Sequence, residues 1–482
     1  MNIHPVRMVL ILTLFTALVG ATSLLAATRL NVLFITADDL GLQLSCYGNT
    51  VISTPHLDRL AERGARFEIA YVAQASCNPS RSAMFTGLYP HANGQYGLMG
   101  RTDAPSGFAL HEHLQDKTIP SYLKRSGYRT GIIGKLHVAP EDSFPFDFRK
   151  RPRIATREVR LVAKTAGEFW QEAGEEPFFL MVNYSDPHAS RSANSVGGWT
   201  FHDQVDGLPK DPILPGAAPP LPFQGIDTPD QLKRVSGYYN TIKRLDAGIG
   251  MLLDELRKAG HAEDTLIIFC GDHGPPFARG KTSVYESGTR VPLTVYWPGV
   301  SRRMTSKAMV STVDILPTIL DAVGEPIPEG LHGRSLRPVV SDPKAAWREY
   351  LVAEFHFHGT RPFYPRRGIR NRRYHLIHNL LAGSNKPSTR IDGDQAYRLS
   401  QTDRFDNTAV RRAFNTFANP PEFELYDTEN DPAELNNLGG NRKLAGVEER
   451  LKEALLRWRH ETDDPLLDPL FVEKLDAHKP PR

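Results

Sequence analysis

The chain has 482 residues, of which 40% are hydrophobic and 23% are charged. This length allows roughly two to four domains with apolar cores of their own, which excludes a peptide-sized or disordered protein. The 58 lysines and arginines nearly balance the 55 aspartates and glutamates, giving a net charge of +3. Such a balance excludes a dominant basic surface, so we expect no nucleic-acid partner and only local binding of anions.

Residues 1–27 have the layout of a cleaved secretory signal peptide. Arg7 precedes an apolar run over residues 8–19, and small residues follow up to Ala27. The run is shorter than the ~20 apolar residues that a bilayer crossing needs, and an uncleaved anchor is the alternative. We therefore predict a secreted or periplasmic protein, or a lysosomal one in a eukaryotic cell, with no membrane contact after cleavage.

Short apolar runs then alternate with helical patterns through most of the chain. Such alternation predicts an α/β fold with a mostly parallel sheet covered by helices on both faces. The runs are residues 31–36, 130–133, 177–183, 265–270 and 291–297. Thr54-Pro55 predicts a helix start, and apolar residues recur at helical spacing over 242–256.

The chain is predicted to divide into an N-terminal catalytic domain, residues 28–343, and a smaller C-terminal α+β domain, residues 344–482. Residues 206–229 are rich in Pro and Gly and predict a surface excursion that shapes the rim of a site. In the C-terminal part, alternating runs predict a short antiparallel sheet with one helix packed on it. These runs are residues 350–355, 374–378 and 424–426, and the helix is predicted over 447–458.

Four of the predicted strands end in polar residues. These are Asp38 and Asp39, then Lys135 and His137, then Asp186 and His188, and finally Asp272 and His273. A single Asp after a strand is routinely a turn or cap residue. Ligands of open α/β sheets bind beyond the carboxyl ends of the strands, so four such endings predict one site rich in oxygen ligands and cations.

The acidic members of this set predict a divalent metal. Asp38, Asp39 and Asp272 would repel one another unless a cation neutralised them, and hard oxygen ligands suit calcium or magnesium. The cationic side chains exceed what a metal site needs. The excess positive charge suits a tetrahedral anion such as sulfate or phosphate. These side chains are Arg81, Lys135, Lys281 and the histidines.

Only three cysteines occur, Cys46, Cys77 and Cys270, which is too few for a disulfide scaffold and leaves at least one thiol unpaired. Whether Cys46 and Cys270 pair stays open. Pro79 can open a helix that places Cys77 near its positive N-terminal end, where a negatively charged oxygen or sulfur is stabilised. Taken alone, Cys77 would more often be a small buried residue.

The segment around Cys77 resembles the signature of the type I sulfatases. The matching residues are Cys77, Pro79, Ser80, Arg81, Thr86 and Gly87. The resemblance implies an alkaline-phosphatase-like fold, one Ca²⁺ per chain, and a formylglycine (3-oxoalanine) made from Cys77 by a sulfatase-maturing partner enzyme. The hydrate of that aldehyde would be the nucleophile.

The same resemblance implies a role for each polar strand-end residue. Calcium would be held by Asp38, Asp39, Asp272, His273 and residue 77. Sulfate charge would be neutralised by Arg81, Lys135 and Lys281. His188 would protonate the leaving atom, and His137 would assist the release of sulfate.

Within that family the chain most resembles the N-sulfoglucosamine sulfohydrolases, in residues 131–138, 144–148, 374–380 and 424–427. This resemblance implies removal of the N-linked sulfate of glucosamine from a sulfated saccharide of heparan type. Two departures leave the sugar open, because His273 stands where asparagine is expected and Lys281 where arginine is expected. Residues 285–292 also resemble sulfatases in general.

Three alternatives to N-sulfate removal therefore stay open. The chain could be an O-sulfate ester hydrolase, a metal-dependent phosphoester hydrolase or a secreted glycan-binding protein with an inactive site. The sequence also leaves open exo against endo action.

Contacts with the saccharide are predicted in a basic, aromatic-interleaved stretch. His356, His358 and residues 361–373, beginning with Arg361, could meet a uronate or a second sulfate, or form a solvated loop. Asp186 could bind sugar hydroxyls or only support its strand end. The oligomeric state is not fixed by the sequence, and a homodimer is compatible with it.

Overall fold

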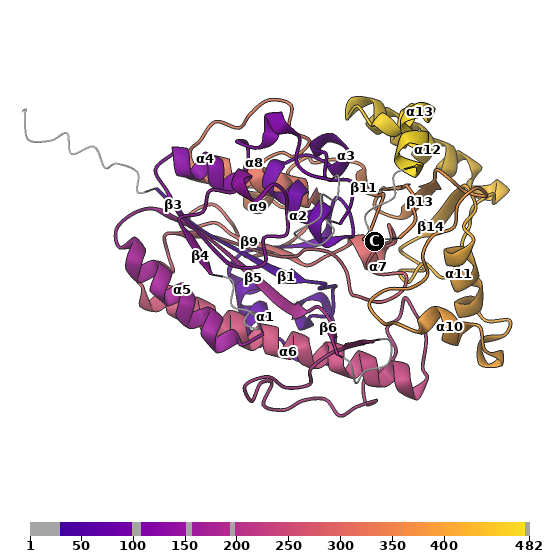
Figure 1. Cartoon of the computed structure of the whole chain (residues 1–482), viewed down its shortest axis with the longest axis horizontal. Helices are drawn as coiled ribbons and strands as arrows, with labels where there is room; N and C mark the ends of the chain where they lie inside the picture. The colour runs from indigo at the N-terminus through magenta and orange to yellow at the C-terminus, as the bar shows by residue number, and fades with distance from the viewer. Residues whose placement is uncertain (1–28, 99–107, 151–156, 193–197, 360, 478–482) are drawn as a thin grey trace, which may run out of the picture.

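The protein is described by a computed structural model over residues 29–98, 108–150, 157–192, 198–359 and 361–477. The predicted signal peptide lies outside these described residues. Among the described helices, none combines the length and apolar character that a bilayer crossing requires. Two sheets divide the fold between them, a large one and a small one that lie side by side (Figure 1).

The large sheet has eight strands in the order β10-β2-β9-β8-β1-β5-β3-β4. They are β1 (Asn31–Asp38), β2 (Ala65–Tyr71), β3 (Arg129–Gly134), β4 (Phe148–Lys150), β5 (Phe178–Pro187), β8 (Thr265–Gly271), β9 (Leu293–Tyr296) and β10 (Met304–Ser311). Only β9 runs antiparallel to its neighbours within this sheet. The predicted mostly parallel sheet is thus confirmed. Every residue of β1 is buried, as expected for a central strand covered on both faces.

Helices cover both faces of the large sheet and form a separate apolar core on each (Figure 1). One face carries α1 (Pro55–Arg63), α5 (Val159–Ala173) and α6 (Pro229–Lys258), and the other carries α2 (Cys77–Thr86), α4 (Ile119–Arg125), α8 (Ile315–Val323) and α9 (Arg337–Ser341). Short helices α3 (Pro90–Asn93) and α7 (Glu286–Thr289) lie near the second sheet. In α6 the predicted spacing buries Leu245, Ile249 and Leu252 completely. Each such side chain contributes about 1.5–3 kcal/mol through its burial.

The small sheet is fully antiparallel, in the order β11-β12-β13-β14. Its strands are β11 (Leu351–Phe355), β12 (Arg366–Arg370), β13 (Tyr374–Asn379) and β14 (Phe423–Asp427), accompanied by α10 (Ala396–Ser400), α11 (Ala409–Ala418), α12 (Ala445–Glu461) and α13 (Pro469–Asp476). Helix α12 packs Leu451, Ala454 and Leu455 on it, so the predicted sheet and helix are confirmed. The predicted domain boundary falls between α9 and β11. It stays a prediction.

Strand β12 lies inside the basic stretch that was expected to meet the saccharide. Arg366, Arg367 and Arg370 are 2%, 0% and 2% exposed. Arg367, for example, donates to both carboxylate oxygens of Asp464 at 2.9 and 2.8 Å. For these three arginines the expectation of saccharide contact is wrong, because all three are buried. Acidic partners and backbone carbonyls hold Arg367 and Arg370, and Arg366 lies over the Tyr364 ring at 4.8 Å.

Residues 206–228 form an irregular connection that leads into α6, as predicted, after the short hairpin of β6 (Ser190–Arg191) and β7 (Trp199–Thr200). Its Gln224 donates to Asp394 Oδ2 at 2.8 Å. Through this hydrogen bond the connection supports the loop that carries Asp394.

A buried ion pair joins β11 of the small sheet to α3. Glu354 on β11 accepts from His91 Nδ1 at 2.6 Å, and both side chains are 0% exposed. Burial would raise the pKa of Glu354, but the charges of His91 and Arg367 lower it from 4.5 to about 2. The ionised carboxylate therefore stabilises the fold, because it is more favourable in the native state than in the unfolded chain.

Acidification is expected to remove this stabilisation. A carboxyl whose pKa is depressed on folding contributes fully above its unfolded pKa and loses that contribution as the pH falls towards its folded pKa. Between pH 5 and pH 3 the Glu354 contribution should fall by about 2 kcal/mol. The measurement is the free energy of unfolding against pH for the native chain and for Glu354→Gln. If their difference stays constant over this range, the assignment of the depressed pKa is wrong.

Candidate active site

The four predicted polar strand ends come together at one edge of the large sheet. Strands β8, β1, β5 and β3 are consecutive neighbours, and all four run parallel. Their carboxyl ends therefore lie at the same edge. The sequence-based expectation of convergence is confirmed, and its cause is the strand order, which no single segment encodes.

The backbone at this edge adopts uncommon conformations. Asp39, His137 and Asp392 have φ values of 69°, 57° and 40°, in the left-handed region that non-glycine residues rarely occupy. Such residues cluster at functional sites because surrounding contacts must hold them there. Asp392 comes from the loop before α10, far from the other two in sequence.

Cys77 is the first residue of α2, as Pro79 suggested. Its side chain is 2% exposed and lies at the helix N-terminus, where the helix dipole favours negative charge. The helix ends at Gly87, whose φ of 68° is left-handed and whose N–H donates to Ala83 O at 2.9 Å. The Thr-Gly of the motif thus terminates the helix that presents Cys77.

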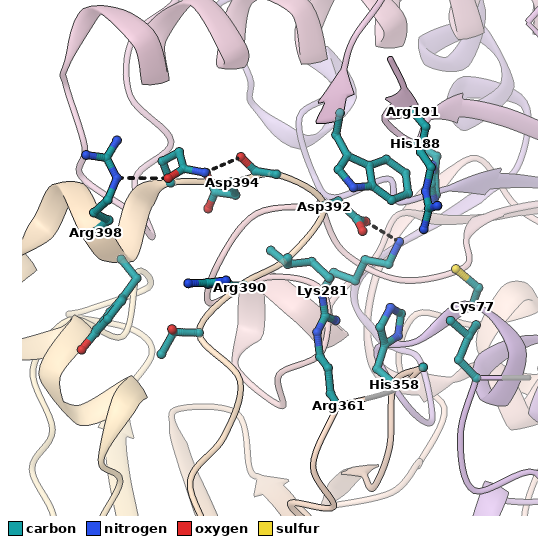
Figure 2. A pocket seen from close by; sticks show the side chains of 18 of the residues that line it. Cys77, His188, Arg191, Lys281, His358, Arg361, Arg390, Asp392, Asp394 and Arg398 are labelled. Atoms are coloured by element: carbon teal, nitrogen blue, oxygen red, sulfur yellow. Dashed lines mark hydrogen bonds and ion pairs between the residues drawn. The ribbon is translucent and has the colours of Figure 1, made fainter. Parts of the chain in front are cut away.

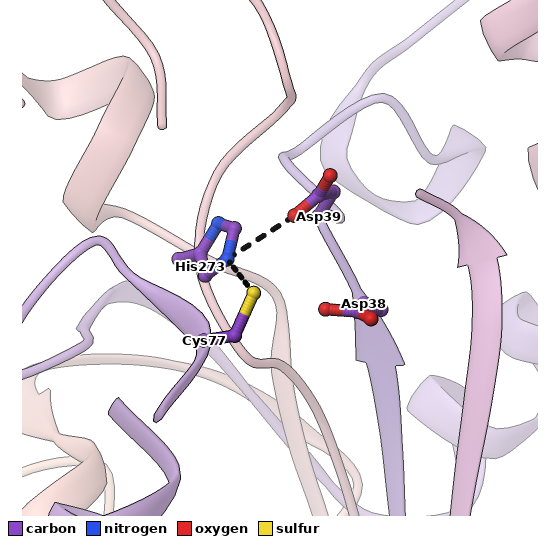
Figure 3. Close-up of side chains that lie close together, drawn as sticks. All are labelled: Asp38, Asp39, Cys77 and His273. Atoms are coloured by element: carbon purple, nitrogen blue, oxygen red, sulfur yellow. Dashed lines mark hydrogen bonds and ion pairs between the residues drawn. The ribbon is translucent and has the colours of Figure 1, made fainter. Parts of the chain in front are cut away.

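Asp38, Asp39, Cys77 and His273 each place one potential ligand atom within 4.8 Å of the others (Figure 3). His273 Nδ1 donates to Gly274 O at 2.9 Å, which points Nε2 towards Cys77 Sγ, 3.2 Å away. Among the described residues Asp38 Oδ1 is buried and accepts no hydrogen bond. A buried carboxylate oxygen without a donor is suited to a cation, so the donor set fits a divalent metal.

Asp272 lies directly beside this cluster. Its Oδ1 accepts from the Asp39 N–H at 3.0 Å and is 3.7 Å from His273 Nε2. Its Oδ2 pairs with Arg81, whose Nη2 is 2.9 Å away and whose side chain is fully buried. Arg81 Nη2 is also 3.8 Å from Asp38 Oδ1. Arg81 therefore compensates two buried carboxylates of the site.

Two lysines complete the cationic side. Lys135 Nζ donates to Asp38 Oδ2 at 2.9 Å. Burial would raise the pKa of Asp38, but the charge of Lys135 helps to hold it well below its usual range. Lys281 Nζ donates to Asp39 Oδ2 at 3.1 Å and to Asp392 Oδ2 at 2.9 Å (Figure 2). Asp392 thus fixes Lys281 from the C-terminal part of the chain.

The surroundings raise the pKa of His273 and lower the pKa values of the two other strand-end histidines. Burial would lower the pKa of His273, but the carboxylate of Asp272 and the Cys77 sulfur raise it to about 10. Burial and the charge of Lys135 lower the pKa of His137 well below its usual value. Burial also lowers the pKa of His188, whose Nε2 is 3.8 Å from Asp39 Oδ2.

A cavity of about 1010 Å³ opens over this group. Seven predicted site residues line it, namely Cys77, Lys135, His137, His188, Lys281, His358 and Arg361. His358 Nδ1 is 2.8 Å from the hydroxyl of Ser76, next to Cys77. The cavity therefore joins Cys77 to a wall contributed by the C-terminal part of the chain (Figure 2).

Two predicted saccharide contacts lie elsewhere. Asp186 is 0% exposed and accepts from Arg244 Nε and Nη2 at 2.7 and 2.8 Å, so it anchors α6 to the end of β5. His356 is also 0% exposed, and its Nδ1 is 3.0 Å from Gln74 Oε1. Neither residue lines the cavity. The expectation that they touch the substrate is wrong, because internal polar partners bury both side chains.

Several cavity residues were not found from the sequence. They are Arg191, Trp199, Arg390, Asp392, Asp394, Tyr397 and Arg398, among others. They come from the β6–β7 hairpin, from the segment leading into α10 and from α10 itself, none of which carries a motif. Residues 390–398 contain two arginines, too few to mark the segment as a binding site.

Two family models match the chain. A sulfatase model matches residues 30–325, and a model described as N-sulphoglucosamine sulphohydrolase, C-terminal, matches residues 271–385. The N-sulphoglucosamine sulphohydrolase of Homo sapiens is 34% identical, over 96% of this chain and 97% of the human one. An ulvan-active sulfatase of Formosa agariphila is 27% identical over 90% of this chain and 81% of its own.

Solved structures share the fold. One protein, solved in complex with its substrate D-glucosamine-2-N,6-O-disulfate, superposes with a TM-score of 0.65 at 21% identity, over 90% of this chain and 98% of that one. The predicted alkaline-phosphatase-like architecture, with its large mostly parallel sheet and small antiparallel sheet, is confirmed.

Proposed function

This chain belongs to the sulfatase family, and we propose that it hydrolyses the N-linked sulfate of glucosamine in a saccharide of heparan type. The observation that carries the proposal is the placement of Cys77 at the start of α2, within 4.8 Å of Asp38, Asp39 and His273. The human relative, named for this reaction and matched over nearly the whole chain, supports the choice of substrate.

Two groups are part of the proposal, a formylglycine at position 77 and a calcium ion. A sulfatase-maturing enzyme would convert Cys77 to the aldehyde, and an oxygen of its hydrate would then take the place of the Cys77 sulfur. When present, the formylglycine hydrate supplies the attacking oxygen, and calcium supplies a Lewis acid that fixes a sulfate oxygen. Asp38, Asp39, Asp272 and His273 would hold the ion, with Asp38 Oδ1 already free of hydrogen bonds among the described residues.

The chain's own cations would bind the sulfate and stabilise the charge that develops during its transfer. Lys135 and Lys281 both line the cavity, and each donates to a carboxylate of the acidic cluster. Because both are fixed by buried partners, they require little reorganisation when charge builds up on the sulfate oxygens. A preorganised contact of this kind is worth about 3 kcal/mol in the barrier.

His188 would protonate the departing nitrogen. Its ring lines the cavity, and burial lowers its pKa, which favours the neutral form. A bound sulfate places negative charge beside the ring and so favours its protonated form. His137, which also lines the cavity, would take up a proton when sulfate is released.

Export to the periplasm or the exterior stays a prediction, as does assembly into a homodimer.

The proposal is tested by incubating the matured protein with three substrate classes, a glucosamine N-sulfate, a sugar O-sulfate and a phosphate monoester. Release of sulfate from the sulfamate at the highest kcat/KM is expected. Preference for the O-sulfate would make the chain an O-sulfatase, and turnover of the phosphate alone would contradict the assignment. Binding of the saccharide without any turnover by material shown to carry formylglycine would support the glycan-binding alternative.

Removal of divalent cations is expected to lower both the melting temperature and the rate of sulfate release. Without the ion, the buried carboxylates of Asp38 and Asp39 repel each other. A cation present at a hundred times its Kd stabilises the fold by about 2.7 kcal/mol. The measurement is thermal unfolding after chelation and after addition of Ca²⁺. The double variant Asp38→Asn, Asp39→Asn should not respond to Ca²⁺, and equal restoration by Mg²⁺ would overturn the choice of calcium.

A further inference from the structure

The outer half of the cavity carries more positive charge than removal of one sulfate needs. Beyond Lys281, four arginines line it, Arg191, Arg361, Arg390 and Arg398. In the described part of the chain none of the four pairs with a carboxylate. Arg191 lies over the Trp199 ring at 5.1 Å, and Arg398 Nε donates to Gln395 at 3.1 Å. Arg361 Nη1 is buried and has no hydrogen-bond partner among the described residues.

The two carboxylates of the same wall are already engaged. Asp392 pairs with Lys281 at 2.9 Å. Asp394 accepts from the side chains of Gln224 and Gln231, both at 2.8 Å, and from the Ala278 N–H at 2.7 Å. These contacts leave the arginines without an internal counter-charge, and they also fix the backbone that carries Arg390 and leads to Arg398. A cationic surface on a fixed support binds an anion with little loss of conformational entropy.

The arrangement and the size of the cavity place these arginines next to the reacting end rather than within it. In Figure 2 Arg361 lies nearest Lys281, Arg390 comes next, and Arg398 lies farthest from Cys77. The volume of about 1010 Å³ is at the top of the ~300–1,000 Å³ range of small-molecule sites. It leaves room beyond a single sugar ring.

We propose that Arg361, Arg390 and Arg398 form a subsite for a second anionic group of the saccharide, next to the sulfate that is removed. The inference rests on the proposed function and names the substrate more closely. Carboxylate and sulfate share the required chemistry, because both accept paired hydrogen bonds from guanidinium. The group is therefore the carboxylate of an adjoining uronic acid or a second sulfate on the same glucosamine.

The test uses three saccharides that differ in the second charge. They are N-sulfated glucosamine alone, the same sugar with an added O-sulfate, and N-sulfated glucosamine linked to an unsulfated uronic acid. We expect at least one doubly charged form to have a kcat/KM about tenfold above that of the singly charged sugar. The gain should come from a lower KM. The charged form that gains identifies the source of the anion. Equal values for all three would overturn the subsite.

The matched variants are Arg390→Gln and Arg398→Gln, whose side chains are exposed, so that the fold is retained. Each variant should remove most of the tenfold preference. The kcat values, and the kcat/KM for the singly charged sugar, should stay nearly unchanged. Arg450→Gln, an exposed arginine of α12 outside the cavity, should change nothing. Loss of turnover on all three sugars together would contradict a role limited to the second anion.

A binding measurement separates this inference from the proposed function. Calorimetric titration of the Cys77→Ala variant with the three saccharides needs no turnover. Binding of a charged form about tenfold tighter than the simple sugar, weakened by Arg390→Gln and by added salt, supports the subsite even if the native chain hydrolyses no sulfamate. Unchanged affinity in both arginine variants would overturn it even if the chain is an active sulfamidase.

Discussion

Replacement of Cys77 by alanine is expected to abolish sulfate release, with a loss of at least about 10⁴-fold in kcat. Residue 77 is the only candidate nucleophile that the structure places at the start of α2 beside the acidic cluster, among the residues it describes. In the variant the lysines and arginines of the cavity can still bind sulfate, but no nucleophile remains to attack its sulfur atom. The measurement is sulfate released per folded molecule, with the state of residue 77 determined by mass spectrometry of its peptide.

Cys46→Ala is the matched control for this experiment. Cys46 lies outside the cavity, and burial raises the pKa of its thiol to about 12, so it is not a reactive thiolate. The variant should keep the native rate. An unmodified thiol at position 77 in fully active material would contradict the proposed nucleophile. Native chain from a host without the maturing enzyme should have the same melting temperature and almost no activity.

Arg81→Leu is expected to lower the free energy of unfolding by about 3–5 kcal/mol. Arg81 lies 2.9 Å from Asp272 Oδ2 with both side chains 0% exposed, so the variant leaves a buried carboxylate without its partner. The folded fraction should also lose about 10- to 100-fold in kcat, because Arg81 holds Asp272 and Asp38, two carboxylates that would bind the metal ion. Denaturant unfolding and rates per folded molecule measure the two effects separately.

Arg367→Leu provides the matched control for Arg81. Arg367 is equally buried and pairs with Asp464 at 2.8 Å, but neither residue belongs to the acidic cluster around Cys77. The Arg367→Leu variant should lower the free energy of unfolding by a comparable amount and leave the rate per folded molecule near that of the native chain. If both variants lose activity to the same extent per folded molecule, Arg81 has only a structural role. An Arg81→Leu protein as stable as the native chain would contradict the buried pair itself.

The elements of the large sheet were largely predictable because each is a local pattern. The run at 31–36 is apolar at every position, which is typical of a strand buried on both faces, and β1 is that strand. Strand β2 was not predicted, although Arg66 and Glu68 alternate with its apolar residues as in a half-buried strand. Strand β12 was missed because it is rich in arginines, which are buried only through contacts with residues distant in sequence, such as Asp464.

The reacting end of the site was predictable for a different reason. Asp38, Lys135, His188 and His273 each follow a strand directly, so one rule of sheet topology brings them together. Asp392 and Arg390 follow no strand and carry no motif. Their place at the cavity depends on how the segment before α10 is held by Lys281 and by the donors to Asp394.

The sequence by itself determined the kinds of chemistry present, since the residue types at strand ends and around Cys77 depend only on local order along the chain. The tertiary structure decided which charges are free to act. Asp186, His356 and Arg367 are as polar as Lys135 or Arg390, yet buried partners neutralise or enclose them. Whether a charged group can meet a ligand depends on whether its side chain reaches the cavity, and only the packing of the whole chain decides that.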